Sequence, residues 1–137
     1  MLRNLKKKMP MDWIFAIMAT IAIPIFKSRV SPVFDTCTRL LLIDFDDNLR
    51  LTRKEFDLDN FSLHERLQVL EKNAVTVIIC GGISGVFHAI LSNSNIQLIS
   101  GICGNVDEVI KAHIEGRLDD PCFFMPGYKD CNKKKTS

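Results

Sequence analysis

Short apolar runs recur along this chain at intervals that predict buried strands. We expect four such strands, at about residues 20–24, 39–45, 75–79 and 96–99. A fifth, at residues 49–56, has alternating character and follows the turn sequence Asp46-Asp47-Asn48, which predicts a hairpin at one flank of the sheet. Pro24 is expected to end the first strand, and residues 27–32 to form a polar loop.

Apolar positions spaced three and four residues apart predict three helices between and after the later strands. The first, at about residues 63–73, begins with a capping box in which Ser62 is the N-cap and Glu65 lies three positions on. The second follows a glycine-rich loop, and the third begins after Asn105 and stops at Gly116. This order predicts an α/β domain of three layers, with a mixed five-stranded sheet and helices on both faces.

Length and charge restrict the functions that this domain can have. The chain of 137 residues has room for one domain, which we place at residues 18–120, between an N-terminal extension (1–17) and an irregular basic tail (121–137). The net charge of +2 conceals two basic ends, since residues 1–17 and 129–137 each carry +3 and the part between them carries −4. An acidic body of this kind argues against nucleic acid as a partner.

The N-terminal extension joins a lysine run, Lys6 to Lys8, to an apolar stretch from Trp13 to Phe26. This order resembles the basic and apolar regions of a signal peptide, but no small-residue cleavage site follows it. The stretch is also short for a membrane span. We therefore expect its end to be the first strand of a cytoplasmic domain, with membrane anchoring as the less favoured alternative.

Three cysteines lie where strands are expected to end and connections to begin. Cys80 follows one buried strand, Cys103 follows the next, and Cys37 lies in the connection after the first. If the strands are parallel, all three thiols gather at the edge where α/β proteins bind ligands, and sulfur ligands there favour iron–sulfur or related metal chemistry. The alternative for each cysteine is a small apolar residue buried at a strand end.

The loops beside these cysteines suit an anionic ligand. Their glycines allow close approach of a ligand, and the helices that follow present N–H groups that attract anions and favour thiolate. The resulting candidate metal ligands are Cys37, Cys80 and Cys103, and the wider candidate cofactor site adds Gly81, Gly82, Ser84, Gly104 and Asn105.

The remaining cysteines and carboxylates give weaker signals. Five cysteines without any C-x-x-C pair predict reduced thiols rather than a disulfide scaffold or a zinc ribbon. Cys122 and Cys131 lie in the expected tail, and their participation is left open. Asp44 and Asp46 share a strand face by their spacing, so that a divalent-metal nuclease is a third hypothesis, although Asp46 is better explained as a turn residue.

Several short segments resemble, in their order and spacing, the dinitrogenase iron-molybdenum cofactor biosynthesis family. The resemblance runs from about Thr20 to Gly127. It is carried by an opening strand and loop, two strand–loop–helix junctions and a closing segment: Ile21-Ala22-Ile23-Pro24, Val30-Ser31-Pro32-Val33-Phe34-Asp35, Ile79-Cys80-Gly81-Gly82-Ile83-Ser84, Gly101-Ile102-Cys103-Gly104-Asn105-Val106-Asp107-Glu108-Val109, Gly116-Arg117-Leu118 and Met125-Pro126-Gly127.

The resemblance implies a ribonuclease H-like fold and a non-catalytic protein that carries, or acts as a chaperone for, an iron–sulfur or iron–molybdenum-type cluster in cofactor assembly related to nitrogen fixation. It also implies a cluster-assembly or recipient protein as a partner. Where many members have a histidine after the first strand, this chain has Val33, which cannot bind a metal, and the ligands then fall to Cys37, Cys80 and Cys103. The alternative is a metal-free module that binds a small anion or a protein through the same loops.

Overall fold

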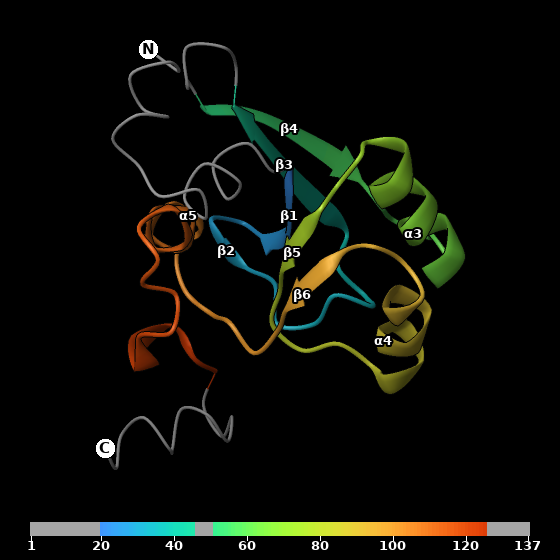
Figure 1. The fold of residues 1–137 in the computed structure, drawn as a ribbon. Coiled ribbons are helices and arrows are strands. Elements are labelled where there is room, and N and C mark those ends of the chain that lie inside the picture. Colours follow the sequence, from blue (N-terminus) through green and yellow to red (C-terminus); the bar gives the residue numbers. More distant parts are fainter. Residues whose placement is uncertain (1–19, 46–50, 126–137) are drawn as a thin grey trace.

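The computed structural model describes residues 20–45 and 51–125, and the elements follow the predicted order (Figure 1). The strands are β1 (Ile21–Phe26), β2 (Arg29–Val30), β3 (Arg39–Phe45), β4 (Leu51–Asp57), β5 (Val77–Ile79) and β6 (Gln97–Ile99). The helices are α3 (Leu63–Lys72), α4 (Gly85–Ser92) and α5 (Val106–Ile114), followed by a 3-10 turn, η1 (Pro121–Phe123). The predicted turn at Asp46-Asp47-Asn48, the extension 1–17 and Cys131 lie outside the described residues.

The strands form one mixed sheet in the order β4-β3-β1-β5-β6, with β2 paired to β1. β3 is antiparallel to β1 and β4, whereas β1, β5 and β6 run parallel to one another. The ends of these parallel strands therefore meet at one edge of the sheet. We call this the carboxyl edge, and its loops are residues 31–37, 80–84 and 100–105.

The first strand corrects two predictions. β1 continues through Pro24 to Phe26, and residues 29–30 form a sixth short strand where a polar loop was expected. A residue's N–H and C=O point to the same side of a strand, and the Pro24 carbonyl accepts from the Ser31 N–H at 2.8 Å. The side of Pro24 that lacks an N–H therefore faces β2. β1 pairs with β5 only as far as Ala22, so Pro24 interrupts no hydrogen bond between β1 and β5.

Helices cover both faces of the sheet, which confirms the three-layer α/β architecture (Figure 1). α5 packs over one face in a core cluster that includes Val77 and Ile79, and α3 and α4 pack over the other in a second cluster that includes Ile78 and Cys80. These four neighbouring residues alternate between the clusters because successive strand side chains point to opposite faces. The ribonuclease H-like assignment stays a prediction.

The start of α3 follows the sequence prediction closely. The Ser62 hydroxyl accepts from the Glu65 N–H at 3.1 Å, and the Glu65 carboxylate accepts from the Ser62 N–H at 2.7 Å, which is the reciprocal pair of a capping box. Among residues 20–45 and 51–125, none of the helices is long and apolar enough to span a bilayer.

Candidate functional site

The glycine-rich loop at the carboxyl edge is filled by another loop of the same chain. The Gly82 N–H donates to the Pro32 carbonyl at 2.7 Å, and the Phe34 N–H donates to the Gly82 carbonyl at 2.9 Å. A Cβ atom on Gly81 would lie only 2.7 Å from the Ser31 carbonyl oxygen. These glycines therefore allow two loops of the chain to pack closely. From the sequence alone, this role could not be distinguished from the close approach of a ligand.

Asp35 occupies the N-terminus of α4, where an anionic ligand was expected. Its carboxylate accepts from the Ser84 backbone N–H at 2.8 Å and from the Ser84 hydroxyl. The same hydroxyl accepts from the Phe87 N–H at 3.1 Å and so caps the helix. The helix end that attracts anions is thus paired with a carboxylate from the chain itself. Sequence reasoning did not predict the contact of Asp35 with Ser84, because no local signal links positions 49 residues apart.

Cys80 and Cys37 lie in the core rather than at an accessible edge. Both belong to the cluster beneath α3 and α4, and their exposed fractions are 0 % and 4 %. Burial, with smaller contributions from Asp35 and Cys37, raises the pKa of the Cys80 thiol to about 12. Burial also raises the pKa of Cys37, partly opposed by Arg66. The prediction that Cys80 ionises easily is therefore wrong, since desolvation outweighs any effect of the α4 terminus.

Arg66 is a buried cation that holds the Cys37 connection in place. Its guanidinium, in a residue only 4 % exposed, donates to the Cys37 carbonyl at 2.7 Å and the Cys37 sulfur at 3.4 Å. It also donates to the carbonyls of Leu58 and Phe61 at 3.3 and 3.2 Å. No sequence pattern indicates this role, because a helical arginine is usually exposed.

Cys103 lies in a different environment from the other two predicted ligands. It is half-buried, and its thiol donates to the Phe124 carbonyl at 3.4 Å. Phe124 packs against the cluster beneath α5, on the other face of the sheet from Cys80. The topology thus brings all three thiols to the carboxyl edge but directs them to different faces.

The loop after Cys103 is shaped by its own caps and glycine. Gly104 adopts a φ of 124°, which side chains rarely allow. The Asn105 side chain accepts from the N–H groups of Asp107 and Glu108 at 2.9 and 3.3 Å, as expected for the N-cap of α5. Both helix termini proposed as anion sites are therefore capped by the protein.

No group of three potential ligands (histidine, cysteine, aspartate or glutamate) that could hold a metal occurs within residues 20–45 and 51–125. One surface hollow, of about 320 Å³, is lined by residues of β4 and α5, and another, of about 140 Å³, includes Asp44 and Thr52. Neither is lined by a cysteine. The structure thus places Cys37 and Cys80 in the core cluster beneath α3 and α4 and Cys103 apart from them, and the three-thiol metal site stays a prediction.

The raised pKa of Cys80 predicts a stability loss at alkaline pH. Above the ordinary thiol pKa of 9.0 the unfolded chain loses the Cys80 proton while the folded chain keeps it until about pH 12. The unfolded state then binds fewer protons, so the free energy of unfolding falls as pH rises through this window. Urea titrations at pH 8 and about pH 10.5 should show a larger fall for the wild type than for Cys80→Ala. Equal falls in both proteins would contradict the assignment.

Comparisons with known proteins agree with this fold. The family model described as "Dinitrogenase iron-molybdenum cofactor" matches residues 17–116.

Three solved structures have a similar fold. PH0822 is 21 % identical with a TM-score of 0.64, and the match covers 72 % of this chain and 93 % of that one. MJ0327 from Methanocaldococcus jannaschii is 27 % identical with a TM-score of 0.59, covering 72 % and 90 %. The apo form of the orange protein from Desulfovibrio gigas is 18 % identical with a TM-score of 0.60, covering 74 % and 91 %. Comparison with curated proteins gave no significant match.

Proposed function

Because this chain belongs to the dinitrogenase iron-molybdenum cofactor family, we propose that it is a non-catalytic carrier of a metallocluster. Its cargo is an iron–sulfur or iron–molybdenum-type cluster, or a precursor of one, in transit to a recipient protein. The observation that carries the proposal is the family match over residues 17–116, which includes the whole carboxyl edge. A reducing cytoplasmic location is part of the proposal and is consistent with four unpaired thiols among the described residues.

We place the cargo at the loop of Cys103, Gly104 and Asn105. Of the three predicted ligands, Cys103 is the one whose residue is partly exposed, so binding there does not require either core cluster to open. Thiolate sulfur is the usual protein ligand of iron–sulfur clusters. Cys37 and Cys80 take no part in it, because both side chains are buried in the core cluster beneath α3 and α4.

A basic turn beside this loop suits an anionic cargo. The Val30 N–H donates to the Gly104 carbonyl at 3.0 Å, and the Val106 N–H donates to the Ser28 carbonyl at 2.9 Å. The β1–β2 turn is thereby fixed against the cargo loop, and its two cations, Lys27 and Arg29, are both exposed. Positive charge at this place attracts anions from solution.

A metal-free protein-interaction module is the second candidate. Val33 and Val86 are 41 % and 65 % exposed, and both belong to segments that flank the glycine loop. Val33 pairs with Gly82, and Val86 lies in the first turn of α4. Exposed apolar side chains on both sides of one loop favour contact with a protein surface. The same surface would serve a carrier that docks with its recipient.

Analysis of anaerobically purified full-length protein separates these two functions. A carrier is expected to contain iron and acid-labile sulfide, with or without molybdenum, or to acquire charge-transfer absorption when iron and sulfide are added. The matched control is the same protein with Cys103→Ser, for which we expect the metal content and the absorption to fall to the background level. Background metal and sulfide in the wild type, before and after reconstitution, would leave the metal-free module as the function.

A further inference from the structure

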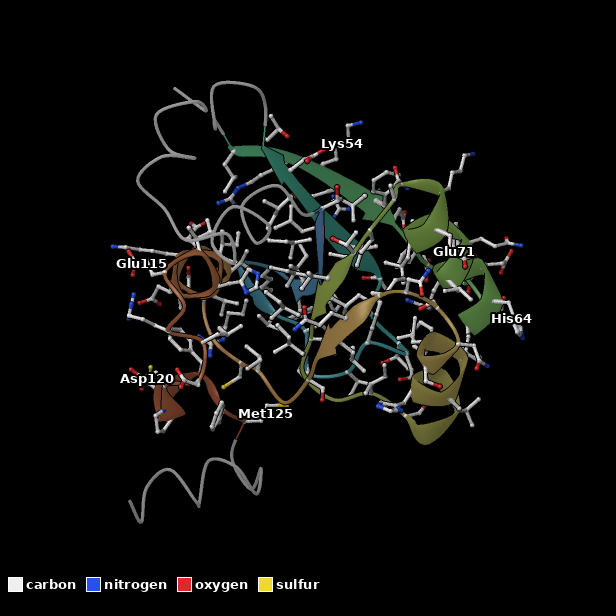
Figure 2. All side chains as sticks on the ribbon, in the orientation of Figure 1. Lys54, His64, Glu71, Glu115, Asp120 and Met125 are labelled. Carbon is white, nitrogen blue, oxygen red and sulfur yellow. The ribbon has the colours of Figure 1, made fainter. Side chains whose placement is uncertain are left out.

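The segment Pro121–Met125, which we call the strap, lies across the loop that contains Cys103. It begins with η1, and Figure 2 labels Asp120 just before it and Met125 at its end. Met125 contacts the loop that joins β6 to α5 through the Gly101 carbonyl. Sequence reasoning assigned these residues to an irregular tail. In the structure they contact the carboxyl edge.

The strap is joined to the loop by backbone hydrogen bonds of a short antiparallel pair. The Cys103 N–H donates to the Phe123 carbonyl at 2.7 Å, and the Met125 N–H donates to the Gly101 carbonyl at 2.9 Å. These two bonds flank the bridge between Ile102 and Phe124. The strap thus follows the whole length of the loop that precedes the Gly104 turn.

The strap also contacts the Cys103 sulfur itself. The thiol donates to the Phe124 carbonyl at 3.4 Å, so one side of the sulfur faces the strap backbone. A Cβ atom on Gly104 would lie 3.9 Å from the Phe123 ring, and one on Gly81 would lie 3.3 Å from the Met125 sulfur. Strap side chains therefore cover both the cargo loop and the glycine loop.

None of the strap residues is fully buried, in contrast with the core elements. Phe123 and Phe124 are only partly buried against the cluster beneath α5. The turn itself depends on Asp120, whose carboxylate accepts from the Cys122 N–H at 3.1 Å. A segment whose residues are all at least partly exposed opens at a lower free energy than the whole domain.

We propose that the strap is an autoinhibitory element that shields the Cys103 thiol and must detach before the sulfur can react or bind a ligand. When the strap is closed, the Cys103 thiol is hydrogen-bonded to the Phe124 carbonyl. With the strap open, the thiol and the loop backbone at Gly101 and Cys103 are free. Its role in cargo exchange rests on the proposed function, whereas the shielding itself does not.

Alkylation of the native full-length protein with iodoacetamide, followed by peptide mass spectrometry, tests the shielding. In the wild type we expect Cys122, which is exposed, to react at least about tenfold faster than Cys103, and Cys37 and Cys80 to stay unmodified because they are buried. Phe124→Ala removes a ring that retains the strap and should accelerate modification of Cys103 about tenfold, with Cys122 unchanged.

Two variants control for general destabilisation. Phe56→Ala removes a partly buried ring from the cluster on the other face and should leave the Cys103 rate unchanged. If Phe124→Ala also exposes Cys37 or Cys80, Asp120→Ala should still accelerate Cys103 several-fold, because it removes the cap of η1. Asp120 also interacts with the Cys122 thiol, so the Cys103 rate of this variant is compared with that of the wild type. Cys103 reacting as fast as Cys122 in the wild type, or failing to respond to both strap variants while Cys80 stays protected, would overturn the proposal.

The same variants separate this inference from the carrier function. If the strap gates cargo, Phe124→Ala should acquire the charge-transfer absorption faster than the wild type during reconstitution. If Phe124→Ala accelerates alkylation of Cys103 but neither it nor the wild type takes up a cluster, the shielding role of the strap is supported and the carrier function is rejected. Equal rates of uptake, in a protein that does bind cluster, would reject the gating role.

Discussion

Replacing Arg66 with methionine is expected to lower the free energy of unfolding by about 3 kcal/mol. Methionine keeps much of the buried apolar volume but donates no hydrogen bond. The carbonyls of Cys37 and Leu58 then lose their buried hydrogen bonds from the guanidinium. Urea denaturation followed by circular dichroism measures the change.

Arg39→Met provides the matched control for this substitution. Arg39 forms a surface ion pair with Glu55 at 3.1 Å, in which both side chains are about half exposed. Such a pair contributes little, so we expect a change below about 0.5 kcal/mol. A similar loss in both variants would show that burial of the Arg66 guanidinium does not matter to stability.

Gly81→Ala is expected to cost about 2 to 3 kcal/mol, because its new Cβ would meet backbone rather than a movable side chain. The carbonyl oxygens of Ser31 and Pro32 would lie 2.7 and 2.9 Å from that atom. Relief requires the two loops of the carboxyl edge to separate, which would also weaken the bonds between Gly82 and residues 32–34. Thermal and urea unfolding report the loss of stability.

Gly85→Ala replaces another glycine, four positions later, and is not expected to destabilise the protein. No atom lies within 4 Å of a Cβ built on Gly85, at the start of α4. Alanine restricts the unfolded chain and favours helix, so stability should stay equal or rise by up to about 1 kcal/mol. Equal destabilisation by both substitutions would refute the close approach of the two loops.

The sequence predicted those features that local patterns determine. The α3 cap is an interaction between residues three positions apart, and the alternation of Ile78 and Ile79 between faces follows from strand geometry. The prediction that Pro24 ends the first strand was wrong. Whether a proline interrupts a strand depends on which neighbouring strand its missing N–H would face, and the order of strands in the sheet decides this.

The candidate site was predicted less well than the fold, because its decisive contacts join distant parts of the chain. The parallel strands β5 and β6 end just before Cys80 and Cys103, whereas Cys37 precedes the antiparallel strand β3. Which face each thiol occupies depends on packing, and the contacts of Asp35 with Ser84 and of Arg66 with Cys37 span 49 and 29 residues. Contacts between residues so far apart in the sequence leave no local motif from which they could be predicted.

The central claim is that the cargo is bound through Cys103 on the surface loop and not through the buried thiols. Anaerobic reconstitution with iron and sulfide, followed by the charge-transfer absorption, compares Cys103→Ser with the double variant Cys37→Ala, Cys80→Ala, each checked for folding by circular dichroism. The account predicts that the absorption is lost in Cys103→Ser and retained in the double variant. Absorption retained without Cys103, and lost without the buried pair, would contradict it.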